Sequence, residues 1–89
     1  MKRQQVTVTN KAGLHARAAS IFVSEAGKYE SDIDVIYGET RLNAKSIMGL
    51  MSGGIGQGAT IVIEANGDDE EEAVDSLVAL IESGFDEED

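Results

Sequence analysis

The single histidine of the chain lies in a setting suited to carrying an anion. His15 stands between Gly13 and a stretch with helical spacing, and Arg17 follows it by two positions. The first turn of a helix has unpaired N–H groups and the positive end of the helix dipole. A phosphoryl group on the imidazole could accept hydrogen bonds from the Ala16 and Arg17 N–H groups, and the Arg17 guanidinium suits its oxygens. These residues predict a phosphorylatable histidine, although an ordinary surface histidine also fits them.

A serine further along the chain allows two interpretations. Ser46 precedes the apolar residues 47–51, so it is expected to cap a short helix. A cap of this kind stabilises a helix by about 1 kcal/mol, which is a complete explanation by itself. A phosphate at the same position would be tolerated by the fold and would add about −2 charge. Physical reasoning leaves both a structural cap and a phosphorylation switch open.

Other kinds of site find little support in the sequence. The absence of cysteine excludes disulfides, thiolate nucleophiles and zinc–thiolate sites. Residues 54–59, GIGQGA, fit a nucleotide-binding glycine pattern, but they follow an expected helix and precede an expected strand, which is the reverse of the required order. One histidine without clustered acids predicts neither a metal site nor a catalytic triad. We therefore expect no cofactor and no metal.

Charge is distributed unevenly along the chain. The net charge is −10, and residues 1–45 hold all seven lysines and arginines, while residues 46–89 hold twelve of the seventeen acids. Without a basic patch to neutralise phosphates, direct nucleic-acid binding is disfavoured. The N-terminal segment lacks the apolar core of a signal peptide, and no apolar run approaches the roughly 20 residues of a membrane span. We expect a cytoplasmic protein without membrane insertion.

Hydrophobic spacing predicts alternating strands and helices. The predicted strands are residues 4–9, 31–37, 40–44 and 60–65, and the predicted helices are residues 16–28, 46–52 and a third that ends at Gly84. In the first strand Val6 and Val8 point to one side. For the third helix, two overlapping pairs of acids, at 68 with 71 and at 69 with 72, could make a capping box. Residues 85–89 are expected to form a frayed tail.

The order of elements is therefore β-α-β-β-α-β-α, in one domain over residues 1–89. Strands with one apolar face, and helices with one apolar stripe, imply a two-layer α+β fold. We expect an antiparallel sheet with the two long helices on one face.

Two segments resemble the signatures of a known family. Residues 13–20, GLHARAAS, resemble the active-centre motif of HPr, the histidine-containing phosphocarrier of the bacterial phosphoenolpyruvate-dependent phosphotransferase system (PTS). Residues 43–52, NAKSIMGLMS, resemble the family's second signature, around a regulatory serine. Both the spacing of the motifs and the element order are those of the family. The resemblance implies an open-faced β-sandwich of four antiparallel strands, with three helices on one face.

The resemblance also implies a role for each candidate residue. His15 would receive a phosphoryl group on Nδ1 from phospho-enzyme I and pass it to an enzyme IIA domain, and so eventually to a sugar. Arg17 would handle the phosphate. Such a carrier is a substrate of other enzymes rather than an enzyme itself. Ser46 would be the site at which HPr kinase/phosphorylase acts.

The short apolar helix is expected to contact partners as well as the core. Four apolar residues in five positions cannot all face the core of one small domain, and methionine makes an adaptable contact surface. In the HPr family this helix lies beside the active histidine and docks partners. We therefore expect Ser20, Ile47, Met48 and Met51 at the partner interface of a monomeric protein. Ordinary core packing is the alternative for each apolar residue.

Two features leave the pathway open. Many HPr proteins have proline after the arginine, whereas this chain has Ala18, an excellent helix former. The ending SGFDEED resembles the nitrogen-related branch of the family. An alternative is therefore a nitrogen-related or catabolite-control regulator that acts mainly through protein binding, which the presence of His15 with Arg17 disfavours. A third and unrelated alternative, a small ligand-binding domain of the ferredoxin-like kind, would need a pocket and no phosphohistidine.

Overall fold

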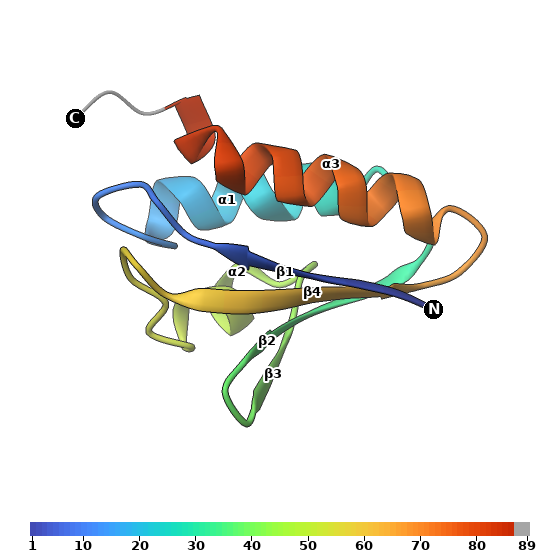
Figure 1. Ribbon diagram of the computed structural model, residues 1–89, viewed down its shortest axis with the longest axis horizontal. Helices are drawn as coiled ribbons and strands as arrows, with labels where there is room; N and C mark the ends of the chain where they lie inside the picture. The colour runs from blue at the N-terminus through green and yellow to red at the C-terminus, as the bar shows by residue number, and fades with distance from the viewer. Residues whose placement is uncertain (87–89) are drawn as a thin grey trace.

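Seven regular elements and a final 3-10 turn make up the protein, whose computed structural model describes residues 1–86 (Figure 1). The strands are β1 (Lys2–Thr7), β2 (Asp32–Tyr37), β3 (Thr40–Asn43) and β4 (Thr60–Asn66). The helices are α1 (Ala16–Ala26), α2 (Ile47–Met51) and α3 (Glu70–Glu82), and the 3-10 turn is Gly84–Asp86. This order of elements is the one predicted from hydrophobic spacing.

All neighbouring strands in the sheet are antiparallel, and their order is β1-β4-β2-β3. β4 lies between β1 and β2, with Ala65 opposite Lys2 and Asn66 opposite Asp32. β2 and β3 form a hairpin whose turn contains Gly38 at φ +62°. The left-handed backbone explains the glycine at this turn, because a side chain there would strain the chain.

The core lies between the sheet and the two long helices. Val35, Ile61 and Ile63 are fully buried on one face of the sheet, and α1 and α3 run side by side over it (Figure 1). Each helix turns one apolar stripe inward, with Phe22 from α1 and Leu77 from α3 fully buried. α2 packs against α1 and β3. The result is the two-layer, open-faced sandwich of four strands and three helices that the sequence predicts.

The start of α3 differs from the predicted capping box. Asp69 precedes the helix, but its side chain makes no cap hydrogen bond. Its carboxylate instead accepts hydrogen bonds from the backbone N–H groups of Glu30 and Ser31 and from the Ser31 hydroxyl. Glu70 Oε1 accepts the Gly67 N–H at 3.2 Å, and this pair lies one residue before the first predicted box and two residues before the second. The predicted capping box was therefore wrong, because the Asp69 carboxylate binds the residues just before β2 instead of the start of α3.

The segment after α3 packs on the core where a frayed tail was predicted. Phe85 lies in the 3-10 turn and is 2% exposed, at φ +59°. Full burial of a phenylalanine gains roughly 1.5–3 kcal/mol, which offsets the roughly 1–2 kcal/mol cost of the left-handed backbone. The last part of the predicted tail, residues 87–89, lies outside the described residues.

Candidate phosphorylation site

His15 is the N-cap of α1, and its own ring occupies part of the helix start. Its backbone is extended, at φ −80° and ψ −178°, and its carbonyl accepts the Ala19 N–H at 2.7 Å. The ring Nδ1 accepts the Arg17 N–H at 3.3 Å. Since Nδ1 is the acceptor, its lone pair points into the first helical turn. The first helical residues, Ala16 and Arg17, are both exposed.

The loop before His15 is held against the glycine-rich loop that leads into β4. The Leu14 N–H donates to the Ile55 carbonyl at 2.9 Å, and both side chains are buried. Gly13 has φ +68°, and a Cβ added there would lie 2.5 Å from the Gly56 Cα. Because a side chain at position 13 would overlap the Gly56 backbone, glycine at this position allows the histidine loop and the glycine-rich loop to pack closely.

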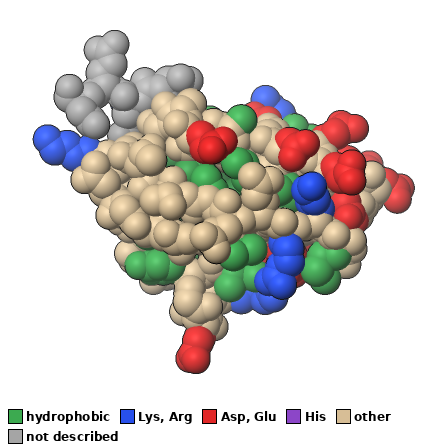
Figure 2. Space-filling model, in the orientation of Figure 1, with side chains coloured by type: hydrophobic (Ala, Val, Ile, Leu, Met, Phe, Trp, Pro, Cys, Tyr) green, Lys and Arg blue, Asp and Glu red, His purple; other side chains and the backbone are tan. Residues whose placement is uncertain are grey.

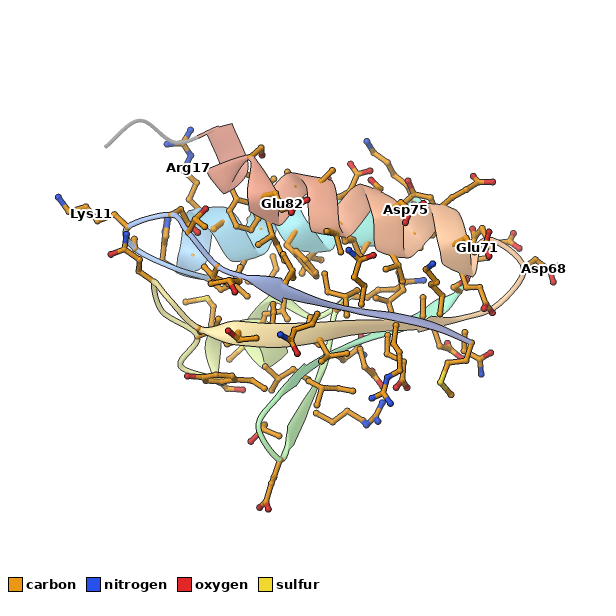
Figure 3. The ribbon with its side chains drawn as sticks, in the orientation of Figure 1. Lys11, Arg17, Asp68, Glu71, Asp75 and Glu82 are labelled. Atoms are coloured by element: carbon orange, nitrogen blue, oxygen red, sulfur yellow. The ribbon has the colours of Figure 1, made fainter. Side chains whose placement is uncertain are left out.

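Two basic side chains near His15 lie far from the acids at the start of α3. Arg17, and Lys11 on the preceding loop, lie at one end, while Asp68 and Glu71 lie at the other (Figure 3). Acidic side chains gather at that second end in the space-filling view (Figure 2). Lys11 and Arg17 thus place positive charge at the His15 end, which favours an anionic group there (Figure 3).

Ser46 is the N-cap of α2, as the sequence predicts. Its Oγ accepts the Gly49 N–H at 3.0 Å, and the residue is half-buried. Beside it, Asn43 Oδ1 accepts the Lys45 N–H at 2.9 Å, and Lys45 Nζ donates to the Tyr29 carbonyl at 2.7 Å. The structural cap is therefore present, and phosphorylation of this serine stays a prediction.

The short helix α2 exposes most of its apolar side chains. Leu50 is fully buried, whereas Ile47 is 41%, Met48 82% and Met51 45% exposed. Ser20, on α1, is also exposed, and α2 packs against α1. This outcome agrees with the prediction that four apolar residues in five positions cannot all enter the core. Their role as a partner interface stays a prediction.

Asn10 is a buried residue of this region that the sequence analysis missed. It is 4% exposed although it lies in a loop, and its Nδ2 donates to the Gly13 carbonyl at 2.8 Å. A buried side chain in a turn follows neither helical nor strand spacing, so no periodic pattern marks it. The one available signal was the preference of asparagine for turns.

The position at which many HPr proteins have proline lies inside an unbroken helix. Ala18 is fully buried, and α1 runs without interruption from Ala16 to Ala26.

Other kinds of site are not supported by the described residues. In residues 1–86, no three His, Cys, Asp or Glu side chains are placed to hold a metal ion. A surface hollow is lined by residues 67–72, at the end opposite Arg17 (Figure 3). None of the helices in the described part of the chain is long and apolar enough to span a membrane.

Comparison with known proteins gives a consistent result. Residues 2–83 match the family model described as the PTS HPr component phosphorylation site. The chain is 49% identical over 82 residues to the HPr-like protein Crh of Halalkalibacterium halodurans, covering 92% of this chain and 98% of the relative. It is 41% identical over 87 residues to the phosphocarrier protein HPr of Cupriavidus necator, covering 98% of each. It is 39% identical over 84 residues to the phosphocarrier protein NPr of Shewanella violacea, covering 94% and 92%.

Solved structures agree with these sequence matches. HPr-C-His from Thermoanaerobacter tengcongensis superposes with a TM-score of 0.96 at 52% identity, over 99% of each chain. An HPr dimer from the same organism superposes with a TM-score of 0.78 at 52% identity, over 98% of this chain and 100% of that one.

Proposed function

The chain belongs to the HPr family of the phosphoenolpyruvate-dependent phosphotransferase system, and on this premise we propose that it carries a phosphoryl group on His15. In the bacterial cytoplasm it would accept the group from phospho-enzyme I and pass it to an enzyme IIA domain. The observation that supports this most is the position of His15 Nδ1, which faces the Arg17 N–H at the start of α1. Family membership also removes the ferredoxin-like alternative.

The chemistry of the transfer needs no acid or base from this chain. The lone pair of His15 Nδ1 attacks the phosphorus of phospho-enzyme I, and the bond from phosphorus to enzyme I breaks as the new N–P bond forms. To react, the lone pair must release the Arg17 N–H. That N–H and the Ala16 N–H are then left for the phosphoryl oxygens, to which the exposed Arg17 guanidinium adds charge-assisted hydrogen bonds.

The experiment is to incubate the protein with phosphoenolpyruvate and enzyme I and then to measure its intact mass. We expect the gain of one acid-labile phosphoryl group, which His15→Ala does not gain. In Arg17→Ala we expect transfer to slow by about 100-fold, the scale of losing one electrostatic stabiliser of a developing anion. No gain of mass with an enzyme I from the same organism would contradict the carrier role.

A regulatory phosphorylation at Ser46 is the second part of the proposal, with HPr kinase/phosphorylase as the partner. Its support is the position of Ser46 at the start of α2, the helix that exposes Met48. A phosphate would add about −2 charge beside an apolar surface, so it would weaken partners that bind the unmodified protein. Incubation with this kinase and ATP should add one acid-stable phosphoryl group, and Ser46→Ala should not gain it.

A regulator that acts mainly through protein binding is the alternative function. The 49% identity to an HPr-like protein Crh favours it, whereas the match to a phosphocarrier protein NPr favours the carrier. His15 with Arg17 disfavours it, because a protein that only binds needs no nucleophile at this helix start. The mass experiment separates the two functions, since a binding regulator would show no phosphohistidine.

The partner face and the oligomeric state belong to the same proposal. We take the exposed side chains of Ser20, Ile47, Met48 and Met51 as the surface that enzyme I and enzyme IIA domains contact. We expect a monomer, whereas an HPr from T. tengcongensis has also been solved as a dimer. Light scattering over a range of concentrations tests this, and a dimer at micromolar concentration would contradict it.

A further inference from the structure

Two polar residues are buried in the described part of the chain, and each lies near one end of the molecule. Ser31 is 1% exposed, and its hydroxyl donates to the Asp69 carboxylate at the start of α3. Asn10 is 4% exposed and precedes Lys11, at the opposite end (Figure 3). A buried polar group costs free energy unless it is hydrogen-bonded. The hydrogen bonds of each side chain therefore show which part of the chain it holds in place.

Asn10 closes the turn before His15 through two different hydrogen bonds. Its carbonyl accepts the Gly13 N–H at 3.1 Å. Its side-chain Nδ2 donates to the Gly13 carbonyl at 2.8 Å. The first bond closes the turn whatever the side chain is, whereas the second exists only because residue 10 is an asparagine.

The side-chain bond fixes one particular peptide group. The Gly13 carbonyl and the Leu14 N–H belong to the same planar peptide. Its carbonyl side is held by Asn10 Nδ2 at 2.8 Å, and its N–H side donates to the Ile55 carbonyl at 2.9 Å. Because both sides are held, this peptide plane cannot rotate without breaking a hydrogen bond.

That peptide directs the chain into His15. Leu14 is the only residue between it and the histidine, and the Leu14 side chain is anchored in the core. The imidazole then reaches the Arg17 N–H over a long separation of 3.3 Å. A small rotation of the peptide would therefore move Nδ1 out of line with the helix start. Gln57 Nε2, which donates to the Thr9 carbonyl at 3.2 Å, gives the same loop a further contact.

We propose that Asn10 is a positioning residue for phosphoryl transfer, whose side-chain amide holds the Gly13–Leu14 peptide and so aims His15 Nδ1 at the first turn of α1. This inference rests on the proposed carrier function of His15. The opposing contact from Ile55 is made by the main chain, so no side-chain substitution removes it directly. Asn10 is thus the side chain through which the positioning can be tested.

The experiment compares two variants of Asn10 with a matched control. Asn10→Ala removes the side-chain amide, and Asn10→Asp keeps its shape but lacks an N–H donor when ionised. Ser31→Ala is the control, because it also removes a buried polar hydrogen bond but lies at the other end of the molecule. kcat and KM for transfer from phosphoenolpyruvate through enzyme I are measured at a temperature where circular dichroism shows every variant folded. The ¹⁵N chemical shifts of the His15 ring are recorded for the same samples.

We expect kcat to fall on the order of ten-fold or more in both Asn10 variants, since small misplacements of a reacting atom have effects of this size. KM should change less, because the exposed side chains of α2 are untouched. The Nδ1 shift should move toward that of a ring nitrogen that accepts no hydrogen bond. Ser31→Ala should leave both kcat and the ring shifts at their wild-type values.

Two results would overturn the proposal. One is wild-type kinetics and wild-type ring shifts in folded Asn10→Ala and Asn10→Asp. The other is an equal loss in Ser31→Ala, which would make the effect a general consequence of lost stability. A wild-type chain that gains no phosphoryl group at all would instead contradict the carrier function, and the positioning role would fall with it.

Discussion

At the scale of single residues, His15 caps α1 with a ring nitrogen, and the 3.3 Å between Nδ1 and the Arg17 nitrogen is long for a hydrogen bond. Asparagine is a much better N-cap than histidine or alanine. We therefore expect His15→Asn to be at least as stable as the wild type and about 1 kcal/mol more stable than His15→Ala. Neither variant should accept a phosphoryl group. Urea unfolding at pH 7 measures the first difference, and intact mass measures the second.

The opposite order of stability would also be informative. A His15→Asn variant that unfolds at lower urea than His15→Ala would show that the ring stabilises the helix start by packing rather than by its hydrogen bond. With the expected order, His15→Asn becomes the preferred control for transfer experiments, because it removes the nucleophile and keeps the cap.

A second prediction at this scale separates two reasons for a glycine. Gly13 and Gly38 both have positive φ, at +68° and +62°. A Cβ on Gly13 would overlap the Gly56 backbone, whereas a Cβ on Gly38 would meet nothing within 4 Å. We expect Gly38→Ala to cost about 1–2 kcal/mol from backbone strain alone. Gly13→Ala should cost about 3 kcal/mol or more, because overpacking adds to the strain.

Urea unfolding of the two glycine variants measures this difference. Equal losses of stability in the two variants would contradict our inference that the Gly56 backbone leaves no room for a side chain at position 13. Because the loss in Gly13→Ala is large, transfer rates in this variant should be compared only below its unfolding transition.

Single residues also show how far the sequence could be interpreted. His15, Arg17 and Ser46 could be singled out because their types and local positions already indicate helix starts and anion binding. Asn10 could not, because its bond to Gly13 lies in a turn that follows no periodic pattern, and the preference of asparagine for turns does not mark it as buried. The Ile55 carbonyl could not, because its role depends on a contact between two loops about 40 residues apart in the chain. No local pattern encodes such a contact.

At the scale of elements, α2 divides its apolar side chains between the core and the surface. Leu50 is fully buried and Met48 is 82% exposed. We expect Leu50→Ala to lower the free energy of unfolding by about 2–5 kcal/mol through the cavity that it leaves. Met48→Ala should change stability by less than about 0.5 kcal/mol, and it should raise the KM of enzyme I for this protein. Thermal unfolding and transfer kinetics measure the two effects.

The α2 prediction has a clear contrary result. If Met48→Ala leaves the KM for enzyme I unchanged, then the exposed face of α2 does not dock that partner. Ile47→Ala and Met51→Ala would show whether the neighbouring exposed side chains replace it.

The start of α3 gives a prediction about pH. A hydrogen bond from the Ser31 side chain, with a further one from the Glu30 N–H, lowers the pKa of Asp69 below its ordinary value of 3.8. A carboxyl with a lowered pKa stabilises the fold above its unfolded pKa, and this contribution is lost as the pH falls through its folded pKa. We therefore expect Asp69→Asn to be less stable than the wild type at pH 7, with the difference shrinking below about pH 4.

Urea unfolding of both proteins between pH 7 and pH 3 measures this trend. Ser31→Ala should reduce the pH-dependent part in the wild-type background, because it removes the largest cause of the lowered pKa. A difference between Asp69→Asn and the wild type that stays constant over this range would contradict a role for the ionised carboxylate.

The elements could be predicted well, except where a residue serves a distant partner. The strands and long helices follow periodic patterns of apolar residues, which report the face of each element that is buried. The cap of α3 follows no such pattern. The sequence offers two adjacent acids as caps and gives no sign that Asp69 hydrogen-bonds Ser31, 38 residues away. Phe85 was missed for a related reason, since a single aromatic after a helix has no period.

At the scale of the whole molecule, the candidate phosphorylation site and the acids at the start of α3 are far apart (Figure 3). The candidate phosphorylation site lies at the end with Lys11 and Arg17, and the acids at the start of α3 lie at the other end (Figure 3). Acids in the first turn of α3 interact favourably with its dipole, which offsets part of their mutual repulsion. Under the proposed carrier function, we expect a phosphorylated partner to approach the end that carries Lys11 and Arg17 (Figure 3).

The net charge of −10 also predicts how salt affects stability. Self-repulsion destabilises a compact, highly charged chain, and salt screens it. Salt also weakens the ion pairs of Arg41 with Asp34 and Glu64, but the Arg41 side chain is 53% exposed in both, so they contribute little. Repulsion therefore dominates, and we expect the thermal midpoint to rise between low and moderate NaCl concentrations. The screening length at 0.1 M is already about 10 Å, so most of the rise should come below that concentration.

Charge variants at the two ends make this expectation specific. Replacing Glu71 and Glu72 together by glutamine removes two charges from the acidic end, so the rise with salt should become smaller. Lys11→Gln makes the net charge more negative, so the rise should become larger. Thermal unfolding of the three proteins in a NaCl series measures the slopes, and potassium chloride serves as a control for effects of the particular cation. A thermal midpoint that falls with salt would contradict this expectation. It would mean that the ion pairs of Arg41 contribute more to stability than the charge repulsion removes, and in that case Arg41→Gln should abolish the fall.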